Sequence, residues 1–142
     1  FYNPDQKIKK EIRRYTGEYW LSKGIKTHEA YKLPSTNKRK KKTLLLYKNF
    51  IKLYGTKIGY ISDKNLFENL EPGTKLELDY LILADDVDAS VQELKEYFEF
   101  QMIILDSSNS YYHRQAFVSA LKKEKIPFHS VRDNGAFRLF FD

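Results

Sequence analysis

The sequence predicts an α/β fold: a mixed, partly parallel sheet with flanking helices, preceded by an amphipathic helix. Two observations predict it. Apolar β-type runs at 78–83 and 102–105 each end in a polar cluster that opens a helical segment. A strand–helix–strand–helix–strand order requires crossover connections, and crossovers make neighbouring strands parallel.

The first part of the chain predicts a helix and a connector. Residues 5–23 place Ile8, Ile12 and Tyr15 on one helical face, and Gly24 is a plausible stop. Residues 25–43 hold turn-forming residues and a basic run, which is typical of an exposed connector. We expect a single domain over 1–142, made of an N-terminal helix (1–24), a basic connector (25–43) and an α/β core (44–142).

The core begins with a predicted meander. Short strands are expected at 44–47, 50–54 and 57–62, with a turn at Gly55-Thr56. After the strand at 78–83, the Ser90-to-Glu93 capping box predicts a helix that ends near Phe98.

The chain then returns to strand at 102–105. Ser110 is expected to cap a helix that reaches about Lys125. The final prediction is a β-hairpin of residues 128–131 and 136–141, because Asp133-Asn134-Gly135 is a hairpin signal.

Composition excludes several kinds of site. The 142 residues contain no Cys, so disulfides, iron–sulfur clusters, thiolate zinc sites and cysteine nucleophiles are excluded. The net charge of +6 slightly favours anionic partners, and the run from Lys38 to Lys42 supplies most of the excess. No apolar stretch is long enough to span a bilayer. The chain starts with Phe1 instead of Met, so we expect it to be a fragment of a longer protein.

The acidic strand ends invite comparison with a phosphorylation receiver domain. There, Asp85 and Asp86 would bind magnesium and Asp106 would accept phosphate. Only one helix separates the two strands, so a strand–helix unit of the receiver is missing. We therefore interpret Asp85, Asp86 and Asp88 as turn and cap residues.

Two further features have alternative interpretations. The segment Asp106 to Ser110 can hold an anion on helix N–H groups, or its side chains can cap those same groups, which we favour. The basic run can contact phosphates, with stacking from Tyr31, Tyr47 and Phe50, or it is a solvated loop tip.

The three histidines do not predict a metal site. None of His28, His113 and His129 has a second His or a carboxylate at metal-ligand spacing. Structural or surface roles are therefore expected for them.

From Phe50 onward the sequence resembles the C-terminal soluble domain of ComEC-type competence proteins, which are membrane channels for DNA uptake. Proteins of this family often end in a metallo-β-lactamase-like domain. Four segments carry the resemblance: GYISD (59–63), LDYLILADD (78–86), IILDSSNSYYH (103–113) and HSVRDNGAFRLFF (129–141). It implies about half of a lactamase-like fold.

The resemblance also implies a decayed active site. Asp63 stands on the metal-binding Asp of the family, and Asp85 and Asp86 replace the histidines of its HHGS motif. The HxHxDH motif is absent from these residues. We therefore expect vestigial metal positions at Asp63, Asp85 and Asp86, no bound metal or cofactor, and no hydrolase activity.

Three functions follow as hypotheses. The first is a non-catalytic domain of a DNA-uptake channel in the bacterial inner membrane, on the periplasmic side. Its partners would be DNA, expected as a single strand, and the transmembrane part of the parent protein, with no small-molecule substrate. The alternative is a metal-dependent nuclease whose missing ligands lie upstream, and the third is a structural interaction module. The expected DNA-contacting residues are Lys38, Arg39, Lys40, Lys41, Lys42, Ser107, Ser108 and Asn109.

Overall fold

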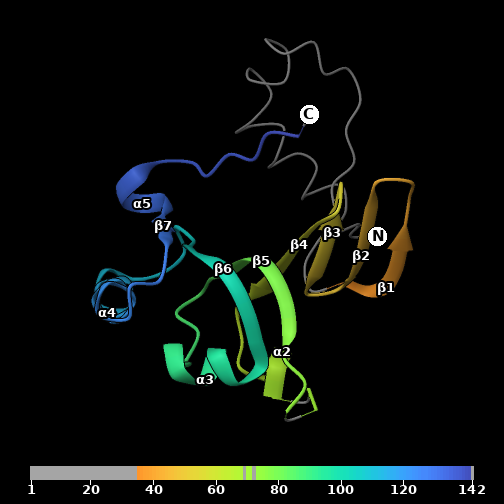
Figure 1. Cartoon of the computed structure of the whole chain (residues 1–142). Coiled ribbons are helices and arrows are strands. Elements are labelled where there is room, and N and C mark those ends of the chain that lie inside the picture. The colour runs from red at the N-terminus through yellow and green to blue at the C-terminus, as the bar shows by residue number, and fades with distance from the viewer. Residues whose placement is uncertain (1–34, 69, 72, 142) are drawn as a thin grey trace, which may run out of the picture. The chain divides into compact units, whose positions relative to one another are not determined.

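The structure is a computed structural model that describes residues 35–68, 70–71 and 73–141 (Figure 1). The chain divides into two compact units, residues 1–32 and 33–142, and every described residue lies in the second unit. The helix expected over residues 5–23 and Tyr31 therefore lie outside the described residues.

The described residues form one mixed sheet of seven strands that follow one another in sequence order. The first three pairings are antiparallel and the last three are parallel, which confirms the α/β class. The strands are β1 (Ser35–Lys40), β2 (Leu44–Lys48), β3 (Phe50–Leu53), β4 (Thr56–Ile61), β5 (Leu76–Leu83), β6 (Phe98–Leu105) and β7 (Phe128–Ser130).

The expected basic connector is wrong for residues 35–40, because these residues form β1. The strand forms because it pairs with the apolar β2, where Lys40 lies opposite Leu45. The backbone N–H of Lys41 donates to the Leu44 carbonyl at 2.7 Å and closes the turn between them. Within the described sheet β1 is an edge strand, and lysines on an edge oppose pairing with other chains.

The two predicted helices of the core are confirmed. Helix α3 (Val91–Tyr97) starts with the full capping box of Ser90 and Glu93. Helix α4 (Tyr111–Lys123) starts at Ser110, whose hydroxyl accepts from the backbone N–H of His113. A single turn, α2 (Asn65–Glu68), follows β4 and was not predicted.

The hydrophobic core lies between one face of the parallel strands and the helices α3 and α4. Leu81 and Leu83 of β5 and Ile103 of β6 have no exposed surface. Leu94 and Leu121 pack against them from the helices and are equally buried. Burial of these side chains fixes the parallel strands, and with them the loops that follow each strand.

The predicted C-terminal hairpin is wrong. Residues 131–134 form a single helical turn, α5 (Val131–Asn134), and residues 136–141 form no strand. The Asn134 side chain accepts from the Ser130 N–H at 3.2 Å, and Gly135 ends the turn with a φ of 80°. The tail runs back from α5 towards the β3–β4 turn (Figure 1), and its Phe141 ring packs there on Tyr54. Gly135 therefore serves as a helix stop.

The Glu93 carboxylate makes the stability of the start of α3 depend on pH. Its carboxylate accepts from Lys64 Nζ and from the Ser90 N–H, each at 2.8 Å, and the Lys64 bond foremost lowers its pKa from 4.5 to about 2. A carboxyl whose pKa falls on folding stabilises the fold above the unfolded pKa, and this stabilisation is lost as pH falls. Glu93→Gln should therefore lower the melting temperature at neutral pH and flatten its decline between pH 4.5 and about 2.

The measurement is a series of thermal melts by circular dichroism from pH 7 to pH 2. Glu96→Gln on the same helix is the matched control, because Glu96 is exposed and is not part of the capping box. An unchanged pH dependence in Glu93→Gln, relative to this control, contradicts the assignment.

Candidate functional site

The ends of three parallel strands bring the predicted polar clusters together. Ile61, Leu83 and Leu105 lie side by side as the last residues of β4, β5 and β6. Since parallel strands end at the same edge of a sheet, the segments 62–63, 84–86 and 106–110 gather at one edge. We call this the carboxyl edge, and it is where open α/β sheets place their ligands.

At this edge the two clusters hydrogen-bond to each other. The N–H of Asp85 donates to Ser108 Oγ at 2.9 Å, and the N–H of Asp86 donates to Asn109 Oδ1 at 3.2 Å. In return, Asp86 Oδ1 accepts from the N–H of Ser110 at 2.6 Å. The φ angles of Asp85 and Asp86 are 54° and 52°, so both residues form a left-handed turn. The expectation that they are turn residues is met, and Asp86 also binds the start of α4.

Asn109 is the buried centre of the carboxyl edge. It is 2% exposed, and its amide nitrogen donates to the carbonyls of Leu83 at 2.8 Å and Asp106 at 2.9 Å. With the Asp86 contact, both polar atoms of its side chain have partners inside the protein. Ser107 and Ser108 of the same loop are exposed. The Asn109 side chain therefore organises the loop and presents no free group to a ligand.

Two of the three carboxylates expected at metal positions, those of Asp63 and Asp86, bind backbone N–H groups. Asp63 Oδ1 accepts from the N–H of Asn65 at 2.9 Å, which supports the start of α2. The backbone N–H of Ser110 lowers the pKa of Asp86. Among residues 35–141, outside the masked positions, no group of three or more His, Asp or Glu side chains is arranged to hold a metal ion.

Asp85 and Asp106 place two carboxylates near Tyr60 at the carboxyl edge. Burial raises the pKa of Tyr60, the carboxylates of Asp85 and Asp106 raise it further, and a hydrogen bond with Ser62 lowers it. Such an environment disfavours a further negative charge, and therefore disfavours a phosphate.

An ion pair between a buried arginine and a half-exposed aspartate, next to this edge, was missed by the sequence reasoning. Arg114 is 5% exposed, and its Nε donates to Asp133 Oδ2 at 3.0 Å. The Ser130 hydroxyl donates to the same oxygen at 2.6 Å. This hydrogen bond is the main reason why the pKa of Asp133 is lowered. Arg114 lies three and seven residues before the buried Phe117 and Leu121, so its place on an apolar helix face was the available signal.

The two described histidines have structural contacts. His129 Nε2 lies 2.8 Å from the Gly135 carbonyl, and its ring packs on Phe137. The His113 ring packs on Phe117. Both contacts fit the structural role expected from the sequence.

A second region, of opposite charge, lies at the turns of the antiparallel strands. An open groove of about 580 Å³ is bordered there by four lysines and by Tyr54, and no acidic residue is among its described lining residues. We call it the lysine groove. It is lined by Lys40, Lys41, Lys42, Thr43, Leu44, Leu45, Lys52, Tyr54 and Gly55.

The lysine groove includes part of the predicted basic run. Lys40, Lys41 and Lys42 are exposed, whereas only the backbone is described for Lys38 and Arg39, which lie in β1. Of the aromatic residues expected beside the run, Tyr31 lies outside the described residues, and neither Tyr47 nor Phe50 is among the lining residues of the groove. Phe50 packs at 6.3 Å from Phe98 at the edge of the core, and Tyr54 is the aromatic residue that lines the groove.

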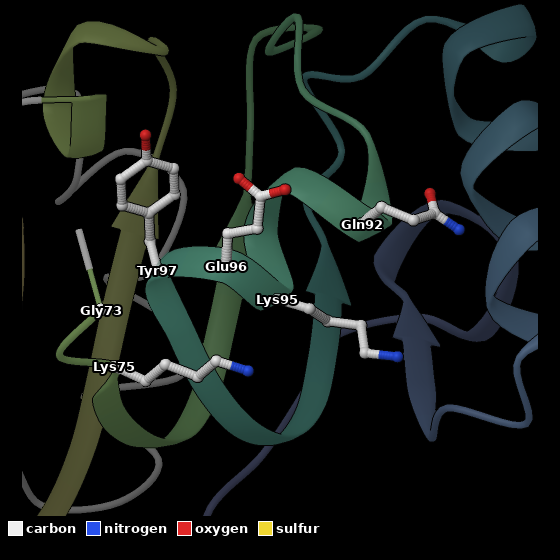
Figure 2. A pocket seen from close by; sticks show the side chains of 6 residues that line it. All are labelled: Gly73, Lys75, Gln92, Lys95, Glu96 and Tyr97. Atoms are coloured by element: carbon white, nitrogen blue, oxygen red, sulfur yellow. The ribbon is translucent and has the colours of Figure 1, made fainter.

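Another open hollow, of about 480 Å³, lies beside α3. Figure 2 shows Gln92 and Lys95 extending towards one side and Glu96 and Tyr97 towards another. Gln92 and Lys95 both bind Glu124 at the end of α4, the lysine at 2.9 Å. Their polar atoms serve the packing of α3 on α4, so this hollow offers weaker support for a ligand than the lysine groove.

A family model described as the ComEC C-terminal domain matches residues 2–141. The chain belongs to this family. No curated protein and no solved structure matches the chain. This family membership associates the chain with competence and DNA uptake. The ComEC C-terminal domain is a domain of a membrane protein. Among the described residues, no helix is long and apolar enough to cross a membrane.

Replacing the Asn109 side chain tests whether it organises the carboxyl edge of this ComEC C-terminal domain. Asn109→Ala removes the three hydrogen bonds that its side chain makes with the Leu83 carbonyl, the Asp106 carbonyl and the Asp86 N–H. The Leu83 carbonyl keeps the Asp106 N–H as a partner. A lost hydrogen bond costs about 0.5–1.5 kcal/mol, so we expect the free energy of unfolding to fall by about 1–3 kcal/mol.

Urea denaturation followed by circular dichroism measures this change. Ser107→Ala is the matched control, because Ser107 is an exposed residue of the same loop. A decrease no larger than that of the control means that Asn109 does not hold the two loops together.

Proposed function

We propose that this ComEC C-terminal domain is a non-catalytic domain that contacts incoming DNA through the lysine groove. The observation that carries the proposal is the concentration of four lysines around one groove, with no acidic residue among its described lining residues. Lysine ammonium groups that neutralise phosphates release counterions, and this supplies most of the affinity of sequence-independent binding.

The position of the groove supports this choice. The Tyr54-Gly55 turn precedes β4, whereas the carboxyl edge follows its last residue, Ile61. The six residues of β4 separate the two regions by roughly 20 Å, at about 3.3 Å per residue. An anionic polymer is therefore attracted to one end of the strand and repelled at the other.

The carboxyl edge is not part of the proposed DNA surface. Ser107 and Ser108 are exposed, but they lie beside Asp85 and Asp106, and Asn109 is buried. The N–H of Ser110, the N-cap of α4, already donates to the Asp86 carboxylate, and this negative charge beside the helix start disfavours a phosphate there.

The hydrogen bonds at the vestigial positions support a non-catalytic role. Asp63 and Asp86 each accept from a backbone N–H of a following helix. A catalytic zinc site needs three protein ligands and an open coordination position. In our proposal, the parent protein's membrane part carries out transport, and this domain contacts single-stranded DNA on the periplasmic side.

Neutralising the groove should weaken DNA binding. The variant Lys40→Gln, Lys41→Gln, Lys42→Gln removes three positive charges, so the net charge falls from +6 to +3. We expect weaker binding and a smaller salt dependence, with the slope of log K against log salt reduced by about 0.7 for each phosphate that the variant no longer neutralises. Fluorescence anisotropy with a labelled single strand at several salt concentrations measures both quantities.

The matched control is Lys122→Gln, Lys123→Gln, Lys125→Gln, which changes the net charge by the same amount at exposed positions around the end of α4. Equal weakening in the two variants means that total charge, and not the groove, controls binding. Undetectable binding by the unmodified chain at low salt refutes the proposal.

A separate experiment tests the proposal that the domain is not a nuclease. The chain is incubated with single-stranded and duplex DNA in Mg²⁺, Mn²⁺ or Zn²⁺, and the DNA is expected to remain intact on a denaturing gel. Metal-dependent cleavage that Asp63→Asn and Asp86→Asn abolish would favour the nuclease alternative.

A further inference from the structure

We infer that Tyr54, backed by Phe141, is a stacking site for an unpaired nucleobase in the lysine groove. This inference rests on the proposed DNA contact and adds to it the residue that recognises the base. The lysines provide charge for phosphates, whereas an aromatic ring provides a surface for the flat face of a base.

The backbone at Tyr54 is unusual for a tyrosine. Leu53 pairs with Thr56, so Tyr54 and Gly55 form a two-residue turn with φ angles of 49° and 88°. Both angles are left-handed, and such turns favour Asn or Asp followed by Gly because a bulky side chain is strained there. The Tyr54 N–H donates to the Thr43 carbonyl at 2.9 Å and holds the turn in place.

The strained turn exposes the ring. The residue is 61% exposed, even though the Phe141 ring lies 5.1 Å away at an interplanar angle of 32°. A tyrosine at this position buries little surface, so packing does not account for it. Strain at a residue that contributes little to the core supports a binding role.

Phe141 reaches this position because the C-terminal tail crosses the sheet. Phe137 packs on Tyr80 of β5 and on His129, each at 5.3 Å, and so anchors the middle of the tail. The tail then continues towards the β3–β4 turn (Figure 1). There the Phe141 ring packs on the Tyr54 ring. The tilted contact of the two rings supports one side of Tyr54 and leaves the ring largely exposed.

The lysines around Tyr54 indicate which kind of ligand the stacking site would bind. Tyr54 shares the groove with Lys40, Lys41, Lys42 and Lys52, and this set of cations complements a phosphate backbone. In a duplex the base faces are covered by their neighbours, so an aromatic side chain gains contact only with unpaired bases. The groove therefore favours a single strand through Tyr54, while the lysines attract both forms.

The test separates stacking from charge by using three ligands of equal length. These are a thymine single strand, the same sugar–phosphate strand with abasic sites, and a duplex, each measured by fluorescence anisotropy with the full chain. Tyr54→Asn should weaken binding of the thymine strand roughly tenfold and leave the abasic strand and the duplex unchanged. Phe141→Leu should weaken binding of the thymine strand in the same direction by a smaller factor.

The variants are chosen so that folding does not obscure the result. Asn tolerates the left-handed turn better than Tyr, so Tyr54→Asn should keep or raise the melting temperature. Tyr112→Asn is the matched control, because Tyr112 is 84% exposed and lies on α4, outside the lysine groove. It should bind all three ligands as the unmodified chain does.

Several outcomes overturn the inference. Equal weakening for all three ligands makes Tyr54 a general contact, and unchanged thymine-strand binding in Tyr54→Asn removes its role. Binding to anionic phospholipid vesicles that needs Tyr54, without Tyr54-dependent binding of the thymine strand, reassigns the ring to a membrane surface. If the unmodified chain binds no DNA at low salt, the proposed function fails too; if lysine-dependent binding persists without Tyr54, only this inference fails.

Discussion

The fold of the carboxyl edge depends on one constraint: β5 and β6 run parallel and end together, so their following loops must share the same space. The Asn109 side chain meets this constraint by bonding to the end of β5, to its own loop and to the Asp86 N–H. A backbone bond from the Asp106 N–H to the Leu83 carbonyl, at 2.9 Å, continues the ladder beyond the strands. The start of α4, and hence its packing on the core, depends on these contacts.

This arrangement separates the charges of the molecule. The acidic loops are joined to one another at the carboxyl ends of the parallel strands, whereas the lysines surround turns at the opposite end of β4. Summed over many groups, such a separation produces a field that orients an approaching polyanion before contact. Within the described sheet β1 is an edge strand, and its Lys40, which opposes pairing at that edge, also borders the groove.

Local signals in the sequence predicted most of the elements. The apolar runs identified β5 and β6, and Ser90, Glu93 and Ser110 marked both helix starts, because capping is a short-range interaction. Long-range contacts decided the rest. Residues 35–40 have the composition of a connector and become a strand by pairing with β2, and Asp133-Asn134-Gly135 formed a helical turn because Ser130 and Arg114 bind the Asp133 carboxylate. The surroundings of Tyr54 likewise depend on a tail at the far end of the chain, and no local pattern encodes that contact.

The same division between local and long-range signals applies to Asp63 and Asp86. The sequence shows that both residues are acidic, but it does not show what their oxygens bind. In the structure Asp63 and Asp86 accept from backbone N–H groups that open α2 and α4, so each carboxylate serves as a structural acceptor. In each carboxylate it is the Oδ1 atom that accepts the backbone N–H, so these bonds fix the orientation of both side chains. The backbone contacts alone therefore give a physical reason for a carboxylate at each of the two positions, because each one supports the start of a helix.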